Sequence, residues 1–260
     1  MLKVEKYLNA VKFNPFYGLR LMMKFPSFLS QYRKFKSDIS EAPAFKLGRF
    51  KPMLTEDSAE SGTGHGVYFY QDLLVAQRIF TLNPVRHVDI GSRIDGFVAH
   101  IASFRAIDVF DIRPLTSDIN NVTFQQCDLM SDLPEELLGC TDSLSCLHTL
   151  EHFGLGRYGD MLDVNGHLKG FANLTRILKS NGRLYFSVPL GSQRIEFNAH
   201  RVFSLSYLLD MIKSASFRIE TFSYIDDSGA LHADVALSPE GIERNCKCNY
   251  GCAVFELIKI

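Results

Sequence analysis

Two histidines and a carboxylate lie within five positions of one another in the segment HTLEH. His148, Glu151 and His152 are residue types that serve in general acid–base catalysis. An imidazole titrates near neutral pH, and a nearby carboxylate can orient it and stabilise its charged form. Such a group could take the proton from a hydroxyl that attacks an electrophile. The alternative is a capped, solvated helix start in which His148 fills the end of a strand.

Further polar residues that could bind a substrate follow this segment. Arg157, Tyr158 and Asp160 lie in a glycine-rich stretch that could approach a sugar closely and hydrogen-bond to it. His200 is a further catalytic candidate, and Arg201 could pair with an anionic substrate group such as a phosphate or uronate. The pair could equally cap the helix that follows.

The segment HVDIGSRIDGF, residues 87–97, could cradle a nucleotide. Asp89 closes an apolar run, and Gly91 with the adjacent Ser92 permits a tight turn. Gly96 would let a ligand approach the start of the next helix.

Two further carboxylates follow at the ends of later apolar runs. Asp111 lies 22 residues after Asp89, where an acid can accept hydrogen bonds from both hydroxyls of a ribose. Asp128 follows the next run, near the expected place of an adenine amino group. A single acid at a strand end is often a helix cap or a solvated turn, but three in this order favour a nucleoside-binding site.

Short apolar runs alternate with helical patterns after residue 84, which predicts a mostly parallel sheet covered on both faces. Helices are predicted over 67–82 and 167–179, the second stopped by Asn181-Gly182. Ligands of such sheets bind beyond the carboxyl ends of the strands, where the acids and histidines above would meet. The predicted strands are Val85–Ile90, Ala106–Asp111, Val122–Gln126, Ser143–His148, Arg183–Val188, Phe217–Ile225 and Cys252–Ile260.

The chain from about residue 85 to 260 resembles the class I S-adenosylmethionine (SAM)-dependent methyltransferases. The unit LTRILKSNGRLYFSVP (174–189) and the following NAHRVFSLSYLLDMIKSASF (198–217) are similar to the second half of small-molecule methyltransferases. The resemblance implies a Rossmann-like α/β fold, a seven-stranded sheet ending in an antiparallel hairpin, and SAM as cofactor. It also implies methyl transfer, for which a sugar hydroxyl is the expected acceptor.

The stretch TLEHFGLGRYGD (149–160) resembles an uncharacterised branch of that superfamily, met in bacterial surface-polysaccharide gene clusters and in nematodes. The resemblance implies a glycan-precursor substrate and a place in polysaccharide biosynthesis. The family's loop reads acid-x-Gly-x-Gly-x-Gly, whereas Arg93 here replaces the second glycine. Its side chain could crowd the methionine part of the cofactor or turn outward and hold the cofactor's carboxylate. A nucleoside-binding or scaffold protein without catalysis is therefore the alternative function.

The amino-terminal residues form a basic, aromatic-rich segment. Residues 1–40 carry eight Lys or Arg against two acids, a net charge of +6, together with eight aromatic residues. A segment of this kind can lie on an anionic membrane surface or bind a partner. The alternative is a pair of helices packed on the protein's own domain, because Pro15, Gly18 and Pro26 are expected to interrupt one long helix. The expected division is an extension and loop over 1–66 and a methyltransferase-like domain over 67–260.

The overall composition is that of an ordinary globular protein. The 260 residues carry a net charge of −1, which gives no electrostatic indication of nucleic-acid binding. No apolar run is long enough to span a bilayer and no secretory signal is recognisable, so a cytoplasmic protein with reduced cysteines is expected, with the 1–40 contact to a membrane peripheral. Cys246, Cys248 and Cys252 lack the usual zinc-ligand spacing, and no metal is expected. The sequence does not indicate an oligomeric state.

Overall fold

A computed structural model describes residues 15–39, 46–54 and 64–260. The chain divides into two compact units, residues 1–63 and 64–260. The part of the basic extension before residue 15, and the Gly/Ser stretch up to residue 63, lie outside the described residues. None of the helices in the described ranges combines the length and apolar character that crossing a membrane requires.

Helix α2 of the first unit runs from Pro15 to Asp38, so the prediction that proline and glycine would break it is wrong. The aromatic rings of Phe25 and Phe28, on either side of Pro26, stack with their centroids 6.3 Å apart. The ring of Phe50, from the extended stretch 46–54, packs edge-on against Phe28 at 5.4 Å. These contacts support the helix across the position where proline removes a backbone donor.

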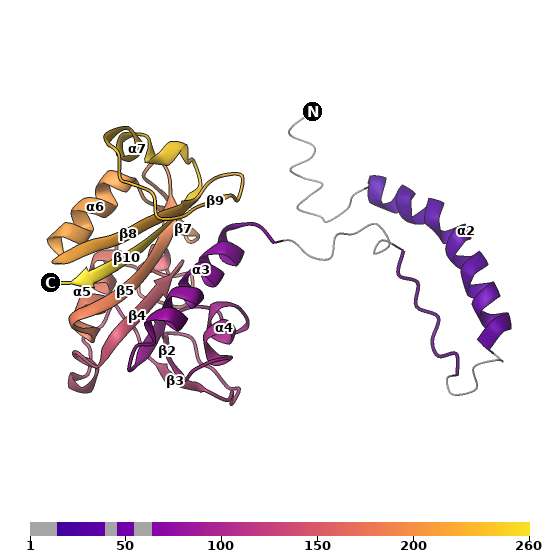
Figure 1. The fold of residues 1–260 in the computed structure, drawn as a ribbon, viewed down its shortest axis with the longest axis horizontal. Coiled ribbons are helices and arrows are strands. Elements are labelled where there is room, and N and C mark those ends of the chain that lie inside the picture. Colours follow the sequence, from indigo (N-terminus) through magenta and orange to yellow (C-terminus); the bar gives the residue numbers. More distant parts are fainter. Residues whose placement is uncertain (1–14, 40–45, 55–63) are drawn as a thin grey trace. The chain divides into compact units, whose positions relative to one another are not determined.

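The second unit is built on one eight-stranded sheet with the strand order β3-β2-β1-β4-β5-β10-β8-β9 (Figure 1). The first five strands in this order are parallel, and β10 runs antiparallel between β5 and β8. The predicted fold class is confirmed, except that the sheet has eight strands where seven were expected, because the two-residue β9 pairs with β8 at the edge. The strands are β1 His87–Ile90, β2 Ile107–Asp111, β3 Val122–Gln126, β4 Thr141–Leu147, β5 Leu178–Leu190, β8 Phe217–Ile225, β9 Leu231–His232 and β10 Gly251–Lys259.

Helices cover both faces of the sheet (Figure 1). On one face, α3 (Val67–Leu82), η3 (Ile94–Val98) and α4 (Ala99–Ala102) enclose a core with β2, β4, β5, β8 and β10. On the other face, α5 (Gly166–Ile177) and α6 (Leu205–Ser214) enclose the larger core. The remaining short elements are η4 Glu135–Leu137, η5 Leu150–His152, β6 Arg194–Glu196, β7 His200–Val202, α7 Pro239–Glu243 and η6 Asn245–Lys247.

Local sequence signals set several element ends. Helix α3 ends at Asn83, which adopts the left-handed conformation that suits a helix stop before proline. Ser204 caps α6, because its hydroxyl accepts a hydrogen bond from the backbone N–H of Tyr207. Helix α5 ends at Ile177, two residues before the predicted end, because Leu178 already pairs with β4.

Two features of the fold escape the periodicity analysis. The chain after β5 turns into the small β6–β7 hairpin, which places His200 and Arg201 on a strand. The helix after β1 begins at Ile94, so Gly96 lies inside η3 and not at its start. Both segments are short, and strands of three residues carry little periodic signal.

Candidate functional site

A cavity of about 670 Å³ lies beyond the carboxyl ends of β1, β2 and β4, where the topology predicts a ligand site. Most of the predicted residues line it. The set comprises Gly91, Ser92, Gly96, Asp111, Asp128, His148, Glu151, His152, Arg157, Tyr158, Asp160 and His200. Asp89 and Arg201 do not line it.

Asp89 is completely buried and shapes the loop that begins the cavity wall. Its carboxylate accepts hydrogen bonds from the backbone N–H of Ser92 at 3.0 Å, the hydroxyl of Ser92 at 2.9 Å and the hydroxyl of Ser145 at 2.5 Å. Gly91 turns the chain with a φ of 72°, and a side chain there would collide with Thr149. The expectation that Asp89 itself contacts a ligand is therefore wrong, because its oxygens are used to hold the turn.

A buried histidine supports this loop from below. His87 lies in β1 with its Nδ1 2.8 Å from the hydroxyl of Ser143 and its Nε2 3.1 Å from the hydroxyl of Ser145. Burial lowers the pKa of His87 to about 3, so the ring is neutral. Because Ser145 donates its proton to Asp89, it accepts from Nε2–H, which fixes the tautomer of His87. Sequence patterns gave no indication of this network.

Asp111 and Asp128 reach the cavity with their carboxylates already engaged. Asp111 accepts hydrogen bonds from Arg113 through its backbone N–H at 2.8 Å, its Nε at 3.0 Å and its Nη2 at 2.5 Å. Asp128 accepts from the N–H of Met130 and the hydroxyl of Ser131, as in a solvated turn. Arg113, which the sequence analysis missed, follows Asp111 by two residues in VFDIRP and also lines the cavity.

Arg93 turns outward from the cradle. Its side chain is 75% exposed and its guanidinium forms a two-point ion pair with Asp95. Of the two predicted orientations, the structure shows the one that leaves the cavity open. Gly96 lines the cavity opposite Asp72 of α3, whose carboxylate oxygen would lie 3.4 Å from a Cβ at that position.

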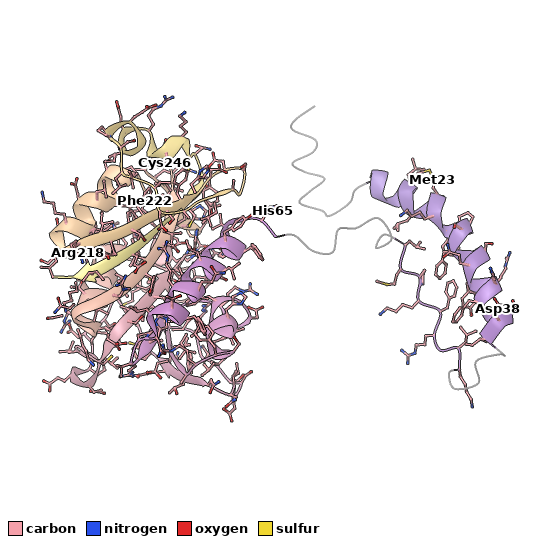
Figure 2. The ribbon with its side chains drawn as sticks, in the orientation of Figure 1. Met23, Asp38, His65, Arg218, Phe222 and Cys246 are labelled. Atoms are coloured by element: carbon pink, nitrogen blue, oxygen red, sulfur yellow. The ribbon has the colours of Figure 1, made fainter. Side chains whose placement is uncertain are left out.

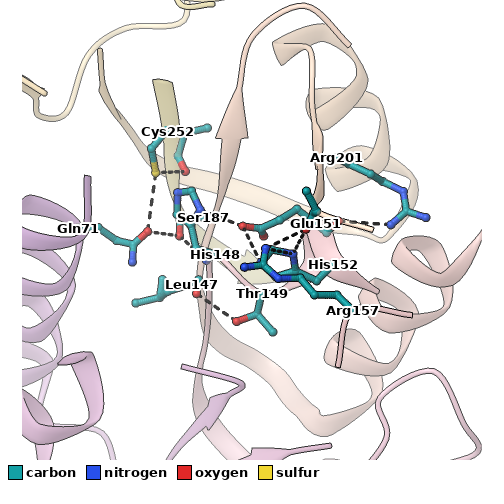
Figure 3. A network of polar contacts seen from close by, with 12 residues as sticks. Gln71, Leu147, His148, Thr149, Glu151, His152, Arg157, Ser187, Arg201 and Cys252 are labelled. Carbon is teal, nitrogen blue, oxygen red and sulfur yellow. Dashed lines mark hydrogen bonds and ion pairs between the residues drawn. The ribbon is translucent and has the colours of Figure 1, made fainter. Parts of the chain in front are cut away.

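The opposite wall is formed by the turn that follows β4 (Figure 3). Glu151 is 1% exposed, and its Oε1 lies 2.8 Å from Nδ1 of His148 and 3.7 Å from Nε2 of His152. His148 adopts a φ of 49°, and its N–H is held by the carbonyl and hydroxyl of Ser187 on β5. The chain therefore leaves β4 in a sharp turn that gathers both imidazoles around one carboxylate.

The two histidines have opposite electrostatic environments. Burial opposes the charged form of His148, but the adjacent Cys252 and Glu151 outweigh it and raise the pKa of His148 well above its usual value. Burial together with the cation of Arg157 lowers the pKa of His152, despite the nearby Glu151 carboxylate. Nδ1 of His152 lies 2.7 Å from the carbonyl of Ala199 and must donate to it. Nε2 of neutral His152 is then free to accept a proton.

Three buried polar atoms of this wall have no hydrogen-bond partner among the described residues. They are Nε2 of His148, Oε2 of Glu151 and Nε2 of His200. Buried polar groups without partners are rare and costly in folded proteins. All three atoms belong to residues that line the cavity.

The polar residues of the glycine-rich loop after η5, which were all predicted to bind a substrate, have different environments. The Asp160 carboxylate accepts hydrogen bonds from the backbone N–H groups of Gly154, Gly156 and Tyr158, so it stabilises the loop. The ring of Tyr158 is contacted by two guanidinium groups, that of Arg113 at 4.6 Å and that of Arg157 at 5.2 Å from its centroid.

Arg201 has a structural role, and the prediction that it pairs with a substrate anion is wrong. It is 4% exposed, and its guanidinium donates to the carbonyls of Phe153, Glu151, Asp163 and Val164 at 2.5–3.4 Å. These bonds tie the turn around Glu151 to the strand β7 (Figure 3). The four carbonyls take up Nη1 and Nη2, and Nε is buried without a partner among the described residues.

Helix α3 and the loop before strand β10 contribute the remaining walls. Gln71 and Asp72 are buried, and Gln71 accepts a hydrogen bond from Ser187 at 2.6 Å while donating to Asp72 at 2.9 Å. Burial raises the pKa of Asp72. Tyr68 and Tyr250 also line the cavity, and neither was singled out from the sequence because lone tyrosines carry no motif. Within the described ranges, no group of three or more His, Cys, Asp or Glu side chains is arranged to hold a metal ion.

A sequence model of the family described as "Caenorhabditis protein of unknown function, DUF268" matches residues 118–245. The match agrees with the expected resemblance to a branch found in nematodes. A comparison with curated protein sequences finds no match.

Solved structures share the fold at low sequence identity. The [4+2]-cyclase SpnF has a TM-score of 0.51 and 17% identity, over 72% of this chain and 79% of its own. A putative sarcosine dimethylglycine methyltransferase from Galdieria sulphuraria has a TM-score of 0.50 and 14% identity, over 72% and 84%. Geranyl diphosphate C-methyltransferase from Streptomyces coelicolor has a TM-score of 0.50 and 11% identity, over 73% and 79%. The second unit therefore has the Rossmann-like fold of the class I methyltransferases.

The buried Asp89 makes a testable contribution to stability. Burial raises its pKa to about 7, against about 4 in an unfolded chain, so the folded protein keeps a proton that the unfolded chain has released between these values. The contribution of Asp89 to the free energy of unfolding is fully present below pH 4 and is lost as the pH rises through 7. In Asp89→Asn this loss should be absent. We expect the difference in free energy of unfolding between the two proteins to change by roughly 3–4 kcal/mol from pH 4 to pH 7 in urea titrations.

The exposed Asp118 provides the control for the loss of one carboxylate. Asp118→Asn should follow the wild-type pH dependence. Parallel wild-type and Asp89→Asn curves would contradict the assigned ionisation of Asp89.

Proposed function

We propose that this protein is a SAM-dependent methyltransferase that transfers a methyl group to a hydroxyl of a sugar or surface-glycan precursor. One observation carries the proposal. A single cavity has nucleoside-cradle residues on one wall, and on the other a buried histidine–glutamate cluster with unpartnered polar atoms. Its volume of about 670 Å³ suits a small-molecule ligand.

The cradle residues fit the nucleoside part of SAM. The Asp111 carboxylate faces the cavity at the end of β2, where it would accept the ribose hydroxyls after exchanging its bonds to Arg113. The turn at Gly91 and Ser92 brings backbone close to the ligand, and Asp72 offers a carboxylate to the ammonium group of the methionine part. The outward position of Arg93 leaves room for that part.

His152 is the proposed base. SAM, when bound, supplies a methyl carbon made electrophilic by its sulfonium. As the acceptor oxygen bonds to that carbon, the carbon–sulfur bond breaks and its electron pair stays on sulfur. Nε2 of His152 takes the hydroxyl proton while its Nδ1–H is held by the carbonyl of Ala199. Glu151, 3.7 Å away, stabilises the imidazolium that forms.

The alternative proposal is a nucleoside-binding or scaffold protein without methyl transfer. The fold by itself does not distinguish a methyltransferase from a protein with another function, since one structure that shares the fold is described as a [4+2]-cyclase. The existing Asp111–Arg113 pair favours the scaffold function alone, because it occupies the carboxylate that would bind the ribose of any nucleoside. Turnover of SAM separates the two. The sugar class and the link to polysaccharide biosynthesis rest on the resemblance of residues 149–160.

Cofactor binding is the first prediction of this proposal. Calorimetric titration should show saturable one-site binding of SAM and of S-adenosylhomocysteine. Asp111→Ala should weaken it by at least tenfold, because a charge-assisted hydrogen bond to the ribose is lost. Asp108→Ala, on the same strand but outside the cavity lining, is the matched control and should bind as the wild type does. Normal binding by Asp111→Ala would mean that the cradle is assigned to the wrong residues.

Loss of the base is the second prediction. With an acceptor found by screening nucleotide sugars and glycans, His152→Ala should lower the transfer rate by roughly 10²–10⁴-fold and leave S-adenosylhomocysteine binding intact. His232→Ala, a histidine at the sheet edge outside the cavity lining, should retain the wild-type rate. A His152→Ala enzyme with full activity would exclude this base.

A peripheral membrane contact at the cytoplasmic face is a separate proposal, supported by α2. The helix exposes Leu19, Met22, Met23 and Phe35, and it carries Arg33, Lys34 and Lys36. Figure 2 shows Met23 projecting from α2. Exposed apolar side chains beside cations suit the interface of an anionic bilayer.

Sedimentation with vesicles containing phosphatidylglycerol tests this contact. We expect binding that weakens with salt and disappears when residues 1–40 are deleted. Replacing both Met22 and Met23 by Asp should weaken binding strongly. Met161→Asp, an exposed methionine of the second unit, should have no effect. Equal binding by all four proteins, or none by the wild type, would refute the contact.

A further inference from the structure

Arg157 differs from the other two arginines of the cavity wall because no carboxylate pairs with it in the described part of the chain. Arg93 pairs with Asp95, and Arg113 pairs with Asp111. Arg157 forms its hydrogen bonds through one nitrogen, Nη1, which donates to the carbonyl of Ala199 at 3.0 Å. Its Nε and Nη2 groups have no hydrogen-bond acceptor among the described residues.

The two acids of the same wall, Glu151 and Asp160, do not pair with this arginine. Oε1 of Glu151 bonds to His148 while its Oε2 has no partner among the described residues, and Asp160 accepts three backbone N–H groups of its own loop. Tyr158 packs its ring against the guanidinium of Arg157 and so fixes its place. The cation therefore stands in the acceptor end of the cavity with two donor groups free.

This cation lies beside the proposed base. Nη1 of Arg157 is 3.5 Å from Nδ1 of His152, where both groups converge on the carbonyl of Ala199. The other charged or titratable groups that face His152 are Glu151, His148 and Tyr158, with His200 further along the same wall. Arg157 contributes to lowering the pKa of both His152 and His200. A base beside an uncompensated cation accepts a proton poorly.

We infer that the acceptor carries an oxyanion, a carboxylate or a phosphate, that pairs with Arg157 next to the hydroxyl to be methylated. The inference rests on the proposed function and assigns to Arg157 the anion recognition that Arg201 does not perform. A planar guanidinium with two free donor groups suits such an oxyanion, and binding neutralises the cation beside His152. A neutral sugar would leave that cation uncompensated. The oxyanion of the acceptor thus makes His152 a stronger base, and His152 then takes the proton from a hydroxyl of the same acceptor molecule.

An NMR titration of the His152 ring tests this inference without requiring turnover. The His152 resonance is assigned with His152→Gln, and its pKa is measured alone and with saturating inorganic phosphate, D-glucuronate or D-glucose. With phosphate or glucuronate the wild-type pKa should rise by roughly one pH unit, because the nearby cation is neutralised. Glucose should leave it unchanged.

Arg157→Gln should already have the raised pKa and should no longer respond to either anion. Arg194→Gln is the matched control, because Arg194 lies in the β6–β7 hairpin, pairs with Glu196 and does not line the cavity. Its response should equal that of the wild type. A response to phosphate alone assigns a phosphorylated acceptor, and a response to glucuronate alone assigns a uronate.

Two results would overturn the inference: no response of wild-type His152 to either anion, or an equal response in Arg157→Gln. The titration is repeated with S-adenosylhomocysteine added, whose own binding is followed by calorimetry. Absence of that binding would refute the proposed function while the anion response still decides the role of Arg157. Intact binding without an anion response would refute only the role of Arg157.

Discussion

A buried carboxylate has to be paired, and the pairing of Glu151 organises the turn after the central strand β4. The residue is 1% exposed, and an unpaired charge at such a place would destabilise the fold severely. His148 supplies the partner, for which it must adopt a left-handed backbone and bond to β5 through its N–H. Arg201 holds the same turn from outside through the carbonyls of Glu151 and Phe153. With His148 committed, His152 remains as the neutral imidazole that faces the cavity.

The cradle side is preformed by a different buried acid. Asp89 holds the turn at Gly91 and Ser92, and the neutral His87 supports it through Ser145. The shape of this loop therefore does not depend on a ligand, whereas the availability of Asp111 does depend on Arg113. The ring of Tyr158 contacts the guanidinium groups of both Arg113 and Arg157. If Arg113 moved away from Asp111, its contact with Tyr158 would change, and Tyr158 also contacts Arg157.

The fold of the second unit does not by itself determine which reaction takes place at the site. The second unit shares its architecture with methyltransferases and with a cyclase at 11–17% identity. The family match over residues 118–245 includes the turn with Glu151 and the loop with Arg157, but it does not include β1 or the Gly91 turn. The matched residues include Asp128 of the cradle as well as the Glu151 turn, while Asp111 and the Gly91 turn lie outside the match.

The sequence alone determined the α/β class, the succession of strands along the chain and the end of the sheet at which the site lies. Alternating apolar runs record these features directly, and the strands Val122–Gln126 and Phe217–Ile225 were predicted to the residue. Sequence spacing could not show where a side chain points. Tertiary packing turned Asp89 away from the cavity, where it accepts from the hydroxyl of the distant Ser145. It turned Arg201 toward the carbonyls of Glu151 and Phe153, some 50 residues earlier in the chain, which needed donors. Arg157 and His152 are close in the sequence, but they meet on the carbonyl of Ala199, which reaches them only after folding.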